Sequence, residues 1–243
     1  MDQLRGLSDS RLMVGCAYCG GADETRDHVP SRVFLDAPFP ENLPVVPACL
    51  ACNRSFSLDE EYVACLIEVA VAGSTDPSRI RRESIAKTLS HSPSLRLSLE
   101  RARTEDNGEV HFAVDEARVM NVMLKLARGH AAFELGVPRR EPPTAMFCLP
   151  IHLMTDAARE DFNAAHVPEV YGEVGSRGFQ RAIVTRFTLL NARGDESTLN
   201  FLLQDWLEVQ EERYRYLAVE TPTASSVKFV IGEYLACGVE WAC

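Results

Sequence analysis

Apolar residues recur at a helical spacing in the first half of the chain. From residue 50 onward they follow one side of a helix that Gly73 ends. The residues on this apolar side are Phe56, Val63, Ile67 and Ala70. Further helices are predicted over 76–89, which begins with an Asp-Pro pair suited to the N-cap and first helical position, over 93–103, and over 115–135.

Short apolar stretches bounded by turn residues predict strands. Two lie near the N-terminus, at 25–29 and 43–46, and an Asp-Asn-Gly turn precedes a third at 109–114. Beyond residue 144 strand-like segments dominate, at 146–153, 181–190, 199–207 and 227–235, with one short helix at 156–165. The pattern predicts an α+β fold with a helical middle and a mainly antiparallel β region after it.

Three regions follow from this order: 11–75, 76–140 and 141–243. The stretch RREPPT at 139–144 is the best candidate for a linker, because its prolines and charges suit exposed chain. The three regions can also pack as one unit, since 243 residues are enough to bury a shared core.

The composition is that of a folded protein, with 46% hydrophobic and 25% charged residues. No apolar run reaches the roughly 18 residues that a membrane-spanning helix needs, and the N-terminus lacks the layout of a signal peptide. We therefore expect a cytoplasmic protein without a membrane partner, whose cysteines stay reduced. Its eight cysteines need a role other than disulfide bonding.

Two Cys-x-x-Cys pairs supply that role. Cys16 and Cys19 form the first pair, Cys49 and Cys52 the second, and Gly20 permits a tight turn after the first. Four thiolates arranged in two such pairs are the usual ligands of a closed structural Zn²⁺ site. The alternative is four cysteines that only pack in a core. The other cysteines, Cys65, Cys148, Cys237 and Cys243, have no ligand spacing, and Cys65 lies on an apolar helix side.

Residues between and after the pairs carry the candidate chemistry. The run T-R-D-H-V-P places Asp27 beside His28, Asn42 precedes the second strand, and Asn53 follows Cys52 directly. With the four cysteines, this order resembles the zinc-containing branch of the HNH, or ββα-metal, endonuclease superfamily, to which phage endonuclease VII belongs. The resemblance covers residues 14–60 and implies a zinc-bound, treble-clef-like ββα module.

The resemblance also implies a role for each residue. His28 matches the general base, and Asp27 and Asn53 match the ligands of a catalytic Mg²⁺ or Mn²⁺. Asn42 matches the residue that braces the loop and orients the base. Asn53 stands where many members of the superfamily have histidine, as in the endonuclease VII type. Arg54 takes the place of a common lysine.

Arg54 and Arg26 are the candidate phosphate-binding residues. Asp59 and Glu60 are either additional metal ligands or first-turn acids on a solvated helix face. Two basic stripes either follow a nucleic-acid backbone or face solvent. They consist of Arg79, Arg81, Arg82 and Lys87 on one predicted helix, and of Arg118, Lys125 and Arg128 on another.

The net charge of −10 argues against binding nucleic acid by bulk attraction, although nearly half of the Lys and Arg residues fall within 76–143. The leading hypothesis is a metal-dependent endonuclease acting on DNA, with residues 76–243 positioning the substrate or contacting a protein partner. One alternative is a non-catalytic, zinc-scaffolded module that binds nucleic acid or protein. Another is an RNA-directed nuclease or toxin, since the site chemistry does not distinguish the sugars.

Overall fold

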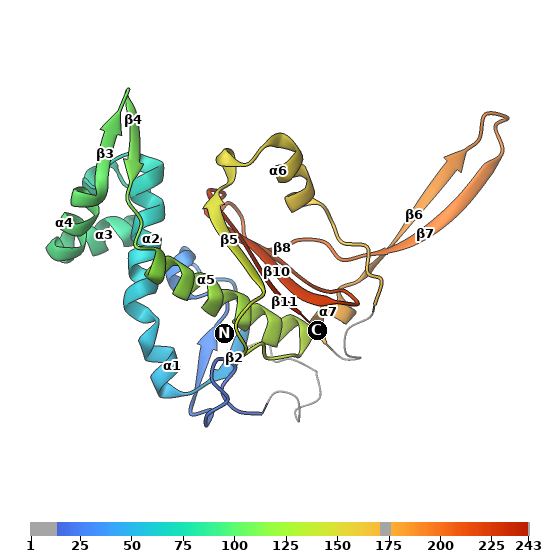
Figure 1. Ribbon diagram of the computed structural model, residues 1–243, viewed down its shortest axis with the longest axis horizontal. Helices are drawn as coiled ribbons and strands as arrows, with labels where there is room; N and C mark the ends of the chain where they lie inside the picture. The colour runs from blue at the N-terminus through green and yellow to red at the C-terminus, as the bar shows by residue number, and fades with distance from the viewer. Residues whose placement is uncertain (1–13, 171–175, 243) are drawn as a thin grey trace.

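A long helix lies at the centre of the fold (Figure 1). The structure, a computed structural model, describes residues 14–170 and 176–242. Helix α5 (Glu116–His130) lies between helix α2 (Ser57–Ala72) and a five-stranded sheet. Asp115 caps its start by accepting a hydrogen bond from the Arg118 backbone. The helix continues as a π-helical turn, η3 (Ala131–Leu135). The predicted helix over 115–135 is confirmed.

The sheet is wholly antiparallel. Its strands, in spatial order, are β5 (Ala145–Pro150), β11 (Leu235–Ala242), β10 (Ala224–Ile231), β9 (Tyr214–Glu220) and β8 (Leu207–Gln210). The predicted strand at 227–235 is confirmed only over 227–231, because the range also spans a tight turn and the first residue of β11. Gly232 and Glu233 have φ of 63° and 49°, a conformation that reverses the chain.

Two hairpins project from the body (Figure 1). Strands β3 (Arg103–Asp106) and β4 (Glu109–Phe112) form one of them. Strands β6 (Ile183–Leu190) and β7 (Glu196–Leu203) form a longer arm. Two short helices, α6 (Asp156–Asn163) and α7 (Arg177–Gln180), precede this arm. The start of β6 was expected at residue 181, but α7 extends to residue 180 and delays it.

The N-terminal region contains two antiparallel strands followed by a helix. Strand β1 (Thr25–His28) pairs with β2 (Val45–Ala48), which begins two residues later than predicted. Helix α1 (Leu50–Ser55) follows, and the chain bends at Phe56 before α2. Gly73 ends α2 with φ of 63°, as its sequence position indicated. The start of the predicted region 11–75 lies outside the described residues.

The predicted helix over 76–89 is interrupted. Asp76 caps only a short 3-10 turn, η2 (Pro77–Arg79), and helix α3 (Glu83–His91) begins after a break. The break turns Ile80 into the core and Arg82 into a buried polar cluster. Helix α4 (Pro93–Ala102) follows as predicted.

The three regions share one hydrophobic core, which runs from Phe34 to Trp241 and includes α2, α5 and the sheet. The stretch 139–144 is not a free linker. Arg139 donates to Ser225 Oγ, and the Glu141 carbonyl accepts from Trp241 Nε1 at 3.2 Å. The antiparallel sheet and the helical middle establish the α+β class.

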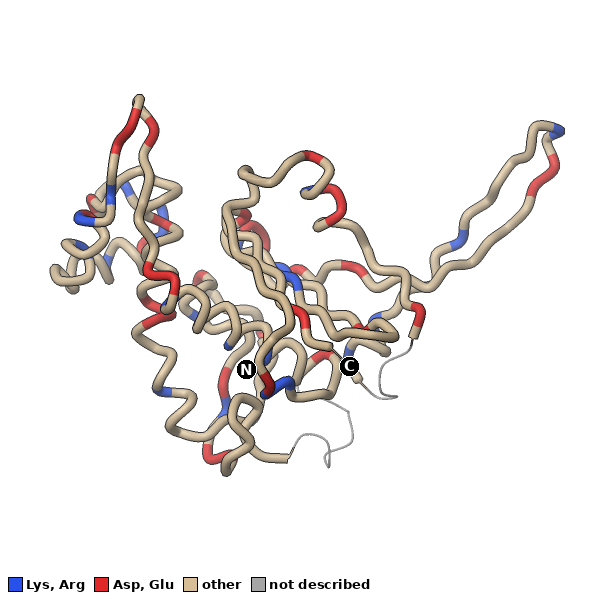
Figure 2. The backbone as a smooth tube through the Cα atoms, in the orientation of Figure 1, with Lys and Arg blue, Asp and Glu red and all other residues tan. Residues whose placement is uncertain are grey.

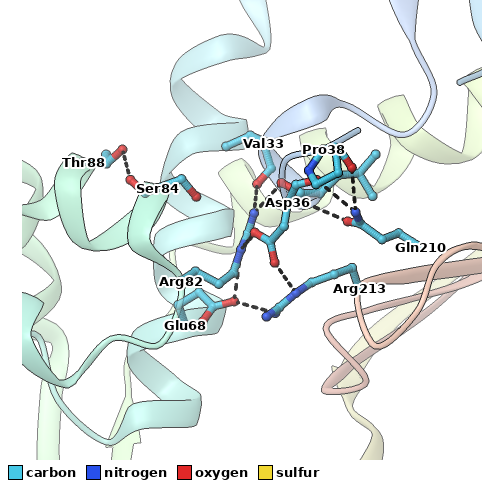
Figure 3. Close-up of polar contacts among 10 residues, drawn as sticks. Val33, Asp36, Pro38, Glu68, Arg82, Ser84, Thr88, Gln210 and Arg213 are labelled. Carbon is cyan, nitrogen blue, oxygen red and sulfur yellow. Dashed lines mark hydrogen bonds and ion pairs between the residues drawn. The ribbon is translucent and has the colours of Figure 1, made fainter. Parts of the chain in front are cut away.

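A polar cluster also joins the three regions (Figure 3). Arg82 Nε lies 2.7 Å from Asp36 Oδ1 and 3.8 Å from Glu68 Oε1. Arg213, after β8, lies 2.6 Å from Asp36 Oδ2 and 3.4 Å from Glu68 Oε1. Gln210 donates to the Asp36 carbonyl at 2.9 Å. Arg82, predicted to lie on an exposed basic stripe, is therefore buried and structural.

We expect Arg82→Met to lower the free energy of unfolding by about 3 kcal/mol, because Asp36 and Glu68 then keep only Arg213 as a cationic partner and the Val33 and Leu35 carbonyls lose their donor. Lys87→Met is the matched control, because Lys87 pairs with Glu83 on the open surface of α3. Urea unfolding of both variants measures the difference. Equal midpoints for the two variants would show that the cluster contributes nothing to stability.

Candidate functional site

Four cysteines converge beside β1. The Sγ atoms of Cys16, Cys19, Cys49 and Cys52 all lie within 4.8 Å of one another. Cys19 and Cys49 have a sulfur–sulfur distance of 3.7 Å. A tetrahedron with Zn–S bonds of about 2.3 Å has sulfur–sulfur edges of about 3.8 Å. The predicted cluster is confirmed, and its geometry fits a metal ion such as zinc.

Local backbone geometry directs these thiols toward one point. Cys16 N donates to the Gly21 carbonyl at 2.7 Å, and Gly20 N donates to the Cys16 carbonyl at 2.9 Å. Gly15 and Gly20 have φ of 78° and 79°, which favours glycine. On the other side, Cys49 is the N-cap of α1, and its Sγ accepts from Cys52 N at 3.3 Å.

In the metal-free protein, the thiols of Cys16 and Cys52 differ in how readily they ionise. Burial opposes ionisation of Cys16, but hydrogen bonds from the backbone of Cys49, Cys19 and Tyr18 outweigh it and lower the pKa of this thiol to about 7. Burial and the neighbouring thiols raise the pKa of Cys52. Cys65, by contrast, is buried on α2 outside the cluster and packs in the core, as predicted.

Asp27 and His28 end β1 with their side chains on opposite faces of the strand. Asp27 is 8% exposed. Its Oδ2 accepts a hydrogen bond of 2.7 Å from the Tyr18 hydroxyl and lies 2.8 Å from Nζ of Lys125. This carboxylate therefore faces the protein interior and has a cationic partner there.

Lys125, from α5, reaches this position through the core. Its side chain is 1% exposed, and Nζ also lies 2.6 Å from Glu60 Oε1 and 2.5 Å from Ser31 Oγ. Helical spacing predicted that Lys125 lies on a stripe that either binds nucleic acid or faces solvent, and both interpretations are wrong. Glu60 is likewise no solvated first-turn acid. The one sequence signal for Lys125 was its place at the centre of an otherwise apolar part of α5.

His28 is half-buried on the other face of β1. Its Nε2 accepts a hydrogen bond of 3.0 Å from Arg32, which begins the 3-10 turn η1 (Arg32–Phe34). Burial, and then the positive charge of Arg32, lower the pKa of His28, and Asp27 opposes this only in part. The imidazole is therefore neutral near pH 7. Arg32 was not among the predicted site residues.

Asn53 connects α1 to β1. Its Nδ2 donates to Thr25 Oγ1 at 3.3 Å and to the Arg26 carbonyl at 3.4 Å, one residue before Asp27. The amide oxygen is the atom of this side chain that can serve as a metal ligand. Asn42 lies exposed in the turn before β2, and no hydrogen bond between described residues joins it to His28. Its bracing role remains a prediction.

The remaining predicted residues lie around this group. Arg26 is exposed, shares a face of β1 with His28, and lies 3.8 Å from Asp23. Arg54 is exposed on α1. Arg118 pairs with Asp59 at 2.8 Å, which occupies both residues in a contact between α2 and α5. Basic and acidic positions are interspersed along the described part of the chain, as Figure 2 shows.

We expect the purified protein to contain one zinc ion per chain and Cys49→Ser to lose it. In small modules such an ion contributes roughly 10–16 kcal/mol to folding, so the melting temperature should fall as well. Cys65→Ser is the control, because Cys65 lies outside the cluster. Elemental analysis by mass spectrometry measures the metal. Full zinc content in Cys49→Ser would contradict the assignment of this ligand.

Comparisons of the chain with protein-family models, with curated proteins and with solved structures find no match. Among the described residues, no helix combines the length and apolar character that crossing a bilayer requires.

Proposed function

We propose that this chain is a metal-dependent endonuclease of the HNH type that hydrolyses phosphodiester bonds of nucleic acid, with DNA as the expected substrate. The observation that carries the proposal is the hydrogen bond from Asn53 to the backbone of β1, directly before Asp27 and His28. It joins the head of a helix to the end of a strand inside a four-cysteine frame. This arrangement agrees with the ββα order of that superfamily.

His28 is the general base in this proposal. Its neutral imidazole accepts a proton from the water that attacks the phosphorus. Without substrate, Arg32 donates a hydrogen bond to Nε2 of His28. When the substrate binds, Arg32 donates to a phosphate oxygen instead, and Nε2 is then free to accept the proton. Arg26, on the same face of β1, supplies a second positive charge toward the substrate.

Asp27 and Asn53 would hold the catalytic cation. Carboxylate and amide oxygens are ligands that Mg²⁺ and Mn²⁺ prefer. When bound, such an ion would supply positive charge beside the leaving oxygen. Tyr18 and Lys125 both contact Oδ2 of Asp27, so Oδ1 is the carboxylate oxygen assigned to the ion. Their contacts fix the carboxylate in one orientation.

His28→Ala should reduce plasmid cleavage in the presence of Mg²⁺ or Mn²⁺ by about 10²–10⁴-fold, the usual contribution of a general base. His91→Ala is the matched control, since His91 is exposed on α3 and its Nδ1 pairs with the Lys87 carbonyl of the same helix. An RNA of the same sequence, assayed in parallel, tests the RNA-directed alternative. Equal cleavage by wild type and His28→Ala would remove His28 as the base.

A second candidate function is a zinc-scaffolded binding module without catalysis. The ion pair between Lys125 and Asp27 favours it, because an ammonium group at 2.8 Å already neutralises the carboxylate that the cation would use. A divalent cation at Asp27 would be repelled by this ammonium group. The negative charge of Glu60, 2.6 Å from Lys125 Nζ, offsets only part of that repulsion.

Titration of the zinc-loaded protein with Mn²⁺, followed by electron paramagnetic resonance, distinguishes the two functions. The nuclease should bind a second metal ion, and Asp27→Asn should weaken its binding at least tenfold. Asp23→Asn is the control, because Asp23 is exposed and precedes β1. If wild type binds no Mn²⁺ beyond the level of Asp27→Asn, the binding module is the better assignment.

A further inference from the structure

Cys148 and Cys237 lie opposite each other on neighbouring strands of the sheet. The antiparallel register of β5 and β11 pairs these two residues directly. Their sulfur atoms are 3.2 Å apart, and Cys237 Sγ lies 3.0 Å from Sδ of Met123 on α5. A disulfide bond of about 2.05 Å requires the two sulfurs to approach by only about 1 Å. The two residues are 89 positions apart along the chain, so no local spacing indicated this pair.

One of the two thiols has access to small molecules. Cys148 lines a groove of about 670 Å³ between α2, β4 and β5, whereas Cys237 is fully buried and does not line it. The groove is mostly apolar, with Val63, Leu66, Val110, Leu153 and Tyr234 among its walls. Such a lining admits a small neutral oxidant more readily than an ion, because an ion would lose its hydration there.

We propose that Cys148 and Cys237 form a reversible oxidation site, in which hydrogen peroxide converts the thiol pair into a cross-strand disulfide. This site is separate from the four-cysteine cluster and independent of the proposed nuclease activity. Its substrate class is a hydroperoxide small enough to enter the groove.

The chemistry proceeds in two balanced steps. The Cys148 sulfur, as thiolate, attacks one peroxide oxygen, the O–O bond breaks, and the leaving hydroxide takes up a proton to become water. Cys148 is then a sulfenic acid. The Cys237 sulfur attacks the Cys148 sulfur, the S–O bond breaks, and the departing hydroxide leaves as water with the proton of the Cys237 thiol. Two thiols lose two electrons and two protons, and the peroxide becomes two waters.

The order of the steps follows from burial. Burial, together with the contact to Cys148, raises the pKa of Cys237 well above its usual value. The accessible thiol is therefore oxidised first, and the buried thiol resolves the sulfenic acid.

The test uses full-length, zinc-loaded protein treated with hydrogen peroxide, alkylated and mapped by mass spectrometry. We expect an intact mass lower by two hydrogen atoms, a cross-linked peptide pair containing Cys148 and Cys237, and reversal by a thiol reductant. Zinc content is measured on the same sample and should stay unchanged. Release of zinc without this cross-link would overturn the proposal.

Matched serine variants separate the steps. Cys237→Ser should stop at the sulfenic acid of Cys148, which a cyclic-diketone probe labels, and Cys148→Ser should give neither product. Cys65→Ser should form the cross-link as wild type does, because Cys65 lies elsewhere in the core. The cross-link is measured in the wild-type protein itself. The proposal can therefore be tested even if one of the variants fails to fold. The same mass loss in Cys148→Ser would contradict the proposal.

Discussion

The buried ammonium group of Lys125 holds the N-terminal strands in place against helix α5. An isolated ammonium in the interior costs several kcal/mol of desolvation. Here Asp27, Glu60 and Ser31 offset that cost from three different elements, with distances of 2.5–2.8 Å. Helix α5 therefore cannot slide along β1 or α2 without leaving a charge unpaired. The same contacts set the position of Asp27 relative to the four-cysteine cluster.

This constraint gives the two faces of β1 different surroundings. Asp27 is held in the interior, where its charge is matched, and His28 remains half-buried on the outer face beside Arg32. A proton acceptor and a carboxylate are thus adjacent in sequence but separated in environment. The proposed reaction needs such a separation, because the base must be neutral to accept a proton while the metal ligand keeps its negative charge.

Local signals in the sequence predicted what local geometry controls. The Cys-x-x-Cys pairs predicted the thiol cluster, and Asp115 and Gly73 marked helix ends correctly. The residues that the sequence placed wrongly, Lys125 and Arg82, owe their burial to partners 14 to 98 positions away. Periodicity assigns a charged residue to a helix face but does not show whether a distant carboxylate covers that face. The turn at Gly232 was missed because apolar residues on both sides read as one strand.

The polar cluster of Figure 3 has a consequence for any attempt to isolate the cysteine-bearing segment. Residues 14–75 contain Asp36 and Glu68, but both guanidinium groups that neutralise them, those of Arg82 and Arg213, come from later in the chain. An excised fragment would expose two acidic groups and the apolar side of α2 at once. The folding unit is thus larger than the segment that carries the chemistry, and grafting that segment onto another scaffold would require equivalent cations to be supplied there.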